Sequence, residues 1–296
     1  MSEPKLHHYV PQFYLNRFTD ASGYLWIWER DRNRIFRTSP HRIAAEKDFY
    51  RVCELAEYGH DPLLLEKQLS HLEGEVALIT NQWLDWLRGM KPQEQIEVPD
   101  VNRDLVSLYI ALQFLRTKDA RDILAAFAQE LENHNPLSAA ERQQLHLHML
   151  WNSGSFREIA TRIKNATWIF GRNTTSVPFI SSDNPVAFRT ADNSRWLKAA
   201  ICSAGTYLVF PLAPDIVMYC HPPEHPWEKL DKFDCCLSPV SFTDGMVESE
   251  NCAQVFMASR FIISLRNDFD RERKFAETIG NRVIEDIGDN CIKSQT

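Results

Sequence analysis

The start of the chain brings together several side chains that can take part in acid–base or binding chemistry. Residues 7–18 include two imidazoles, two phenols and a guanidinium, contributed by His7, His8, Tyr9, Tyr14 and Arg17, together with the amide of Gln12. If this segment is extended, alternate side chains point to opposite faces, so only one histidine can readily enter a pocket on each face. The same residues also fit a partly buried strand whose histidines bond to the backbone.

A second polar motif, Ser181-Ser182-Asp183-Asn184-Pro185, follows a short apolar segment. The proline restrains Asn184 to an extended or turn conformation, and Ser and Asp side chains readily bond to nearby backbone amides. The motif therefore fits an Asx-type turn. It also fits a site in which Asp183 accepts a proton or stabilises a cation, Asn184 fixes a polar substrate edge, and Ser182 contributes to binding.

Arg116 has an unusual place on a predicted helix. At 100° per residue it projects inside or beside the apolar stripe, whereas an ordinary solvated arginine would fall opposite. A guanidinium in that position needs a carboxylate or phosphate partner. Gln113 and Arg121 lie on the neighbouring face. Glu66 and Glu73, at the border of an earlier helical stripe, are candidate internal partners, so the arginines fit either an ion-pair network or a phosphate site.

Composition limits the classes of protein that the chain can represent. Its 296 residues include 40 acidic and 33 basic side chains, and the formal net charge of -7 argues against coating nucleic acid or anionic membrane through bulk charge. A local basic cleft is compatible with this total. The seven cysteines include no C-x-x-C pair, and no apolar run reaches signal-peptide or membrane-span length. We expect a soluble cytoplasmic protein with reduced thiols and no membrane contact.

Several well-known chemical motifs are missing from the sequence. It contains no Gly-rich phosphate loop, no G-x-S-x-G and no H-E-x-x-H, which disfavours P-loop hydrolysis, ordinary serine-hydrolase chemistry and zinc proteolysis. Two histidine pairs, at 146 and 148 and at 221 and 225, have no third ligand at a compelling spacing. We therefore expect neither a metal nor a cofactor.

Hydrophobic periodicity predicts the elements that must position these residues. Strand-forming residues on either side of positions 31–33 predict a hairpin, and apolar residues at helical spacing predict long helices over 61–89 and from Asp100 onward. Capping-box spacings at Ser138 and Ser155 predict two shorter helices. Short apolar runs predict strands at 167–170, 179–180, 186–188, 206–210, 216–220 and 261–265, and a last helix is predicted over 271–287.

This order of elements favours an α+β fold. We expect a single domain in which a mixed or antiparallel sheet, built from residues 1–60 and 166–270, is covered by a helical subdomain over about 60–165. The first hairpin is expected to join the later sheet.

In combination, these motifs resemble the bacterial family classed as domain of unknown function 4238. The resemblance rests on His7-His8-Tyr9-Val10-Pro11 with the following Phe-Tyr-Leu and Arg-Phe, on Gln113 with Arg116-Thr117, on Ser182-Asp183-Asn184-Pro185, and on residues 210–214. It departs at Lys118, where the family more often has proline. The resemblance implies a component of bacterial defence against phage, where enzymes that attack nucleic acid are common.

The candidate residues and the resemblance together lead us to expect a hydrolase that acts on phage-derived nucleic acid, most plausibly a DNA glycosylase. Asp183 would stabilise the sugar cation or activate water, His8 or His7 would assist the departing base, and Asn184 would read its edge. The tyrosines at 9 and 14 would stack on the base, and the arginines at 17, 116 and 121 would hold phosphates. The alternatives are a metal-dependent nuclease using a histidine, Asp183 and Glu66, and a noncatalytic sensor of a phosphorylated or phage ligand.

Overall fold

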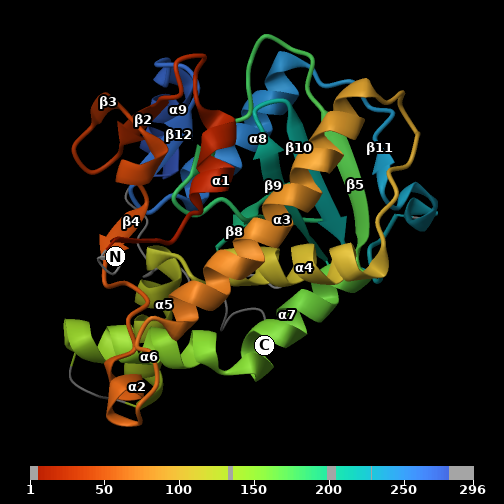
Figure 1. Cartoon of the computed structure of the whole chain (residues 1–296). Helices are drawn as coiled ribbons and strands as arrows, with labels where there is room; N and C mark the ends of the chain where they lie inside the picture. Colours follow the sequence, from red (N-terminus) through yellow and green to blue (C-terminus); the bar gives the residue numbers. More distant parts are fainter. Residues whose placement is uncertain (1–5, 133–135, 199–204, 228, 280–296) are drawn as a thin grey trace.

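The computed structural model describes residues 6–132, 136–198, 205–227 and 229–279, and it confirms the α+β class. The strands form three sheets, and the four-stranded one contains strands from distant parts of the chain (Figure 1). The helices are α1 (Gln12–Leu15), α2 (Cys53–Glu57), α3 (Leu64–Gly89), α4 (Asp100–Leu115), α5 (Lys118–Glu132), α6 (Ala139–Trp151), α7 (Ser153–Asn165), α8 (Asp244–Met257) and α9 (Asp270–Ile279).

The largest sheet has six strands in the order β11-β5-β10-β9-β7-β8. All its pairings are antiparallel except the parallel pair β11 and β5, so the sheet is mixed. Its strands are β5 (Thr167–Arg172), β7 (Ala187–Thr190), β8 (Trp196–Leu197), β9 (Thr206–Ala213), β10 (Ile216–His221) and β11 (Cys236–Leu237).

A four-stranded sheet in the order β3-β2-β12-β6 joins the beginning of the chain to its end. Its strands are β2 (Leu25–Glu29), β3 (Arg34–Thr38), β6 (Ser181–Ser182) and β12 (Phe261–Ser264). The predicted hairpin is confirmed as β2 and β3, and it joins later strands because β2 pairs with β12. A separate small sheet pairs β1 (Leu6–His8) with β4 (Ala45–Lys47).

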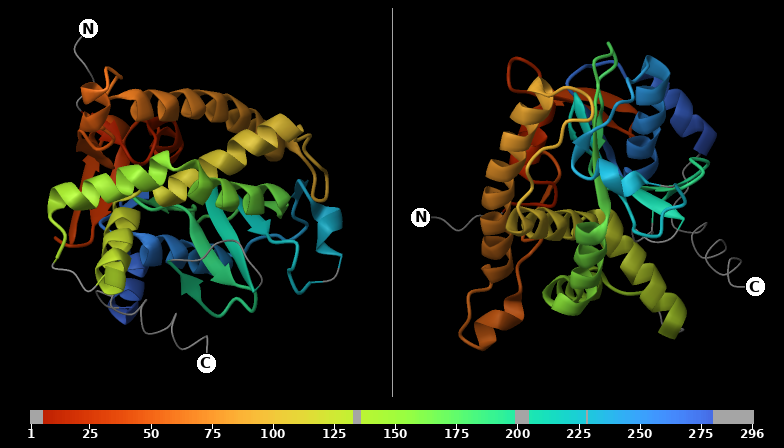
Figure 2. Two further views of the ribbon diagram at one scale, coloured as in Figure 1. Left: turned by 90° about the horizontal axis from the view of Figure 1, so that it is seen from below. Right: turned by 90° about the vertical axis from the view of Figure 1, so that its right-hand side faces the viewer.

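The main hydrophobic core lies between the six-stranded sheet and the helices α3 and α4. Alternate residues of β9 point to opposite faces, so Leu208 and Phe210 enter this core while Tyr207 and Val209 enter a smaller cluster on the other face. In Figure 2, right, α3 runs along one side of the strands and α8 lies on the other side. The sheet is therefore covered on both faces.

Several predicted elements differ in detail. The opening segment is not extended throughout, because α1 begins at Gln12. The predicted strand at 179–180 is displaced to Ser181–Ser182, and α7 begins at Ser153, capped by Asn152, instead of at the expected box. The capping box at Ser138 is confirmed. The final helix begins at Asp270, and its predicted part beyond 279 lies outside the described residues.

The second long helix breaks where continuity was expected. Helix α4 ends at Leu115, and Arg116 has φ -87° and ψ 2°, outside the helical range. The Thr117 hydroxyl then accepts a hydrogen bond from the Ala120 amide at 3.2 Å, which is the geometry of a helix N-cap, and α5 starts at Lys118. The break turns the chain and places the first turn of α5 beside the Ser-Asp-Asn-Pro motif.

Candidate functional site

A cavity of about 530 Å³ with charged walls lies between the N-terminal segment, the β2–β3 hairpin, the start of α5 and the junction of β6 with β12. We call it the charged cavity. Five residues of its lining carry the discussion that follows: Tyr9, Glu29, Arg34, Asp183 and Arg260. A more open hollow of about 690 Å³ at the end of α3 contains none of the predicted site residues.

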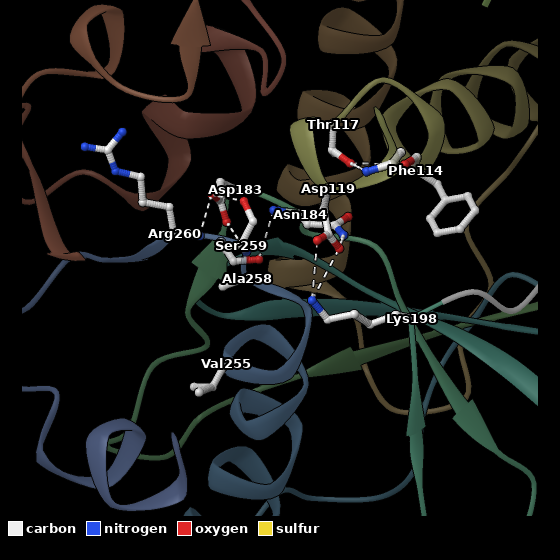
Figure 3. A network of polar contacts seen from close by, with 12 residues as sticks. Phe114, Thr117, Asp119, Asp183, Asn184, Lys198, Val255, Ala258, Ser259 and Arg260 are labelled. Carbon is white, nitrogen blue, oxygen red and sulfur yellow. Dashed lines mark hydrogen bonds and ion pairs between the residues drawn. The ribbon is translucent and has the colours of Figure 1, made fainter. Parts of the chain in front are cut away.

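Asp183 is buried at the wall of this cavity, directly after β6, with 1% of its surface exposed. Its Oδ1 accepts a hydrogen bond from the Ser259 amide at 3.0 Å. Its Oδ2 accepts from the Ser259 hydroxyl at 2.7 Å and from the Arg260 amide at 2.9 Å (Figure 3). Burial raises the pKa of Asp183 to about 6, helped by the negative charge of Asp119 and opposed by the bond from Ser259. The carboxyl can therefore exchange a proton close to neutral pH.

A buried polar network lies behind Asp183 (Figure 3). The Asn184 side-chain amide donates to Asp119 Oδ2 at 3.2 Å, and Lys198 Nζ lies 3.4 Å from the same oxygen. The Ser182 hydroxyl donates a hydrogen bond to the Gln254 side chain and accepts one from the backbone amide of Asn184, so it stabilises the turn at residues 182–184. Asn184 Oδ1 has no hydrogen-bond partner within the described part of the chain. Asn184 and Ser182 thus support Asp183 from behind the cavity wall and do not face a ligand within it.

Tyr9 links the charged cavity to the two polar helix residues predicted from the sequence. Tyr9 lines the cavity, and its carbonyl accepts hydrogen bonds from Gln113 Nε2 at 3.0 Å and Arg116 Nε at 3.2 Å. Burial, together with the negative charges of Asp183 and Glu46, raises the pKa of the Tyr9 phenol well above its usual value. The phenol therefore stays protonated and can donate a hydrogen bond.

Glu29, Arg34 and Arg260 form the other wall, and none of the three was predicted. Arg34 donates from Nε at 3.1 Å and Nη2 at 2.7 Å to Glu29 Oε2, and Arg260 donates from Nε to Oε1 at 2.9 Å. Burial alone would raise the pKa of Glu29, but the bonds from the two arginines outweigh it and hold that pKa below its ordinary value. Glu29 is therefore a buried, charged anchor for two guanidiniums.

The two histidines lie apart from Asp183 and do not share its cavity. His7 is fully buried, its Nδ1 accepts from the Tyr50 amide at 2.9 Å, and its ring stacks on Tyr50. His8 Nε2 donates to the His41 carbonyl at 3.2 Å, which leaves Nδ1 as the acceptor for Gln12 at 3.5 Å. Burial lowers the pKa of His8, so the ring is neutral near pH 7. The expected contact between these histidines and Asp183 in one pocket is not what the structure shows.

His8 and Gln12 instead line a second, smaller cavity of about 280 Å³ together with Glu66 and Glu73. Burial and the charge of Glu73 raise the pKa of Glu66 to about 7. The ligand set expected for a metal-dependent nuclease is therefore divided between two cavities. No group of three or more His, Cys, Asp or Glu side chains in the described ranges has the arrangement of a metal site.

The predicted base-stacking role of Tyr14 does not fit its position. Tyr14 has no exposed surface, its hydroxyl donates to the Pro211 carbonyl at 2.8 Å and lies 2.9 Å from Ser181 Oγ, and its ring stacks on Phe210. The residue holds the N-terminal segment against β6 and β9. A buried ring with every face occupied cannot receive a base.

The three arginines expected to hold phosphates are occupied by protein groups. Arg116 is 1% exposed and pairs with Glu73 at 2.7 Å, as the helical pattern predicted for an internal partner. Arg17 donates to Leu212, Asn81 and Thr80 near the end of β9 and on α3. Arg121 lies 3.4 Å from Glu46 and 3.7 Å above the Phe49 ring. These contacts support the fold, and the expected role of the three arginines as phosphate ligands does not fit them.

Comparison with known proteins gives a family but no activity. The model of the family described as "Protein of unknown function (DUF4238)" matches residues 6–268, which include every lining residue named above. No curated protein and no solved structure matches the chain. Among the described helices, none is long and apolar enough to cross a membrane.

Proposed function

We propose that this chain, which belongs to the DUF4238 family of proteins of unknown function, hydrolyses the N-glycosidic bond of a nucleotide in nucleic acid. One observation carries the proposal: a buried carboxyl that titrates near pH 6, that of Asp183, lines the same cavity as the Tyr9 phenol and the guanidiniums of Arg34 and Arg260. A carboxylate, a neutral donor and cations are the groups that this cleavage uses.

The chemistry assigns one role to each group. As the bond from the sugar carbon to the base nitrogen breaks, positive charge develops on the sugar and the Asp183 carboxylate stabilises it. Water adds to the sugar carbon and gives one proton to Asp183, the departing nitrogen takes one proton from solvent, and Asp183 then returns its proton to solvent. The Tyr9 phenol donates a hydrogen bond to the base.

The hydrogen bonds to Asp183 fix the orientation of its carboxylate. The amide and hydroxyl of Ser259 and the amide of Arg260 donate to its two oxygens, and the Phe261 amide also stabilises the charged form. Because these donors come from one segment of the chain, the carboxylate is preorganised for the sugar or for water.

The experiment incubates the purified protein with modified and unmodified phage DNA and resolves released bases and strand breaks by mass spectrometry. We expect free base and abasic sites, in EDTA as well as without it, and loss of both in Asp183→Asn. Asp85→Asn, on the exposed surface of α3, is the matched control. Near-ultraviolet circular dichroism verifies that both variants are folded.

Other outcomes of this experiment would contradict the proposed glycosidic hydrolysis. Cleaved phosphodiesters that disappear in EDTA would favour a metal-dependent nuclease. If neither product forms and no nucleic acid binds at low salt, both enzyme proposals are wrong.

A noncatalytic ligand sensor is the second candidate, because the hydrogen bonds of Asp183 also pin the start of β12 to β6. In that case a folded Asp183→Asn protein would still protect cells in a plaque assay, whereas the enzyme proposal requires loss of protection.

A further inference from the structure

Three charged residues meet at the point where three neighbouring strands lie side by side. Glu29 is the last residue of β2, opposite Arg34 on β3 and Phe261 on β12, and Arg260 directly precedes Phe261. Glu29 has 1% of its side chain exposed, whereas Arg34 and Arg260 have 55% and 40% exposed. The buried carboxylate thus holds two guanidiniums whose outer parts are open to the charged cavity.

We propose that Arg34, Glu29 and Arg260 form a binding subsite for one phosphate group. Two guanidiniums and one carboxylate leave a net charge of about +1, and Arg32 Nε, 3.9 Å from Glu29, adds to the local positive charge. The cavity as a whole contains acids as well as bases, so an anion can be held only where positive charge is locally in excess. This triad is such a place.

The hydrogen-bonding groups of the two arginines suit a phosphate. A guanidinium has five N–H donors in a fixed plane, and both arginines direct Nε and Nη2 toward Glu29. No residue in the described part of the chain accepts a hydrogen bond from their Nη1 groups, so these groups can donate to a ligand. Each guanidinium can donate a directed N–H group to a phosphate oxygen, whereas a lysine acts only as a point charge.

The guanidiniums are also fixed before a ligand arrives. Arg34 lies 4.7 Å over the Phe36 ring and Arg260 lies 4.7 Å over the Phe261 ring, so each plane is held by an aromatic face as well as by Glu29. Ordering a long side chain on binding costs conformational entropy, and this cost is reduced where the side chain is already held.

The subsite lies next to the proposed reacting group. The Arg260 amide donates to Asp183 Oδ2, so one residue contributes its backbone to Asp183 and its side chain to the triad. A nucleotide whose phosphate occupies the triad would place its sugar toward Asp183. That the phosphate belongs to a nucleotide rests on the proposed function, whereas phosphate binding by the triad does not.

Calorimetric titration of the full chain tests the subsite with three probes: inorganic phosphate, the four deoxynucleoside 5′-monophosphates and the matching deoxynucleosides. We expect a monophosphate to bind at least about tenfold more tightly than its nucleoside. Arg34→Gln and Arg260→Gln should each remove this preference, and Arg34→Lys should keep part of it. Arg37→Gln, on the same strand but paired with Asp20, is the control and should behave as the unaltered chain.

Equal affinity for nucleoside and monophosphate, or a preference that persists in both Gln variants, would overturn the subsite. The two proposals fail separately. Phosphate binding that depends on Arg34, without release of base from DNA, retains the subsite and refutes the hydrolase. Release of base that depends on Asp183, together with equal affinity for nucleoside and monophosphate, retains the hydrolase and refutes the subsite.

Discussion

Replacing Asp183 with asparagine should change how the stability of the protein depends on pH. The pKa of this carboxyl is about 6 in the folded chain and 3.8 ordinarily, so the folded state binds its proton more tightly than the unfolded state does. The stabilisation is complete below pH 3.8 and is lost as the pH rises through 6. At 1.36 kcal/mol per pH unit, the loss amounts to about 3 kcal/mol.

Urea unfolding followed by tryptophan fluorescence, repeated from pH 4 to pH 7.5, measures this effect. The free energy of unfolding of the unaltered chain, minus that of Asp183→Asn, should fall by most of that amount across the range. Groups other than Asp183 titrate in both proteins and cancel in the difference. The lost hydrogen bonds add an offset that does not vary with pH. Parallel curves for the two proteins would show that burial does not perturb this carboxyl.

Three substitutions away from the charged cavity test how the fold is held together, each by urea denaturation. Glu73→Gln leaves the buried Arg116 without its charge partner and should lower the free energy of unfolding by about 3 kcal/mol; a change below 1 kcal/mol would mean that the pair is solvated. Gly171→Ala would place a Cβ 2.7 Å from the Phe242 ring and should cost about 1–3 kcal/mol, so an unchanged midpoint would contradict the packing. Tyr14→Phe should lower the free energy of unfolding by about 1–2 kcal/mol and leave base release unaltered; loss of base release in a stable variant would mean that this tyrosine takes part in the reaction.

Local signals in the sequence were sufficient for much of the fold. The hairpin β2–β3, the helix α3 and the cap at Ser138 depend on residues close to one another in the chain, and all three were predicted. Helix α8 was missed because the face that packs on β6 contains amides. Asn251 and Gln254 are buried there and bond to the backbone of Pro178 and Pro185, which interrupts the apolar period.

The site was harder to predict than the fold. The Asp183 motif could be recognised as chemically dense, but its partners Ser259 and Arg260 come from a segment whose position depends on the pairing of β12 with β6. Arg260 and Glu29 are separated by 231 positions, and no sequence spacing relates them. The two histidines point to opposite faces of β1, as expected for an extended segment, but His7 is buried against Tyr50 and only His8 lines a cavity, which is not the one that contains Asp183.

The charged cavity is built from segments that are far apart in the chain, and this has a consequence for synthesis of the protein. Its walls come from Tyr9, the hairpin, the start of α5, Asp183 and the Ser259–Phe261 segment. While the ribosome is still making the chain, the walls supplied by residues up to 183 exist without their counterpart, and Asp183 has neither Ser259 nor Arg260 to orient it. The complete cavity can assemble only once position 261 has emerged. A nascent chain therefore passes through most of its translation without the arrangement proposed to attack nucleic acid.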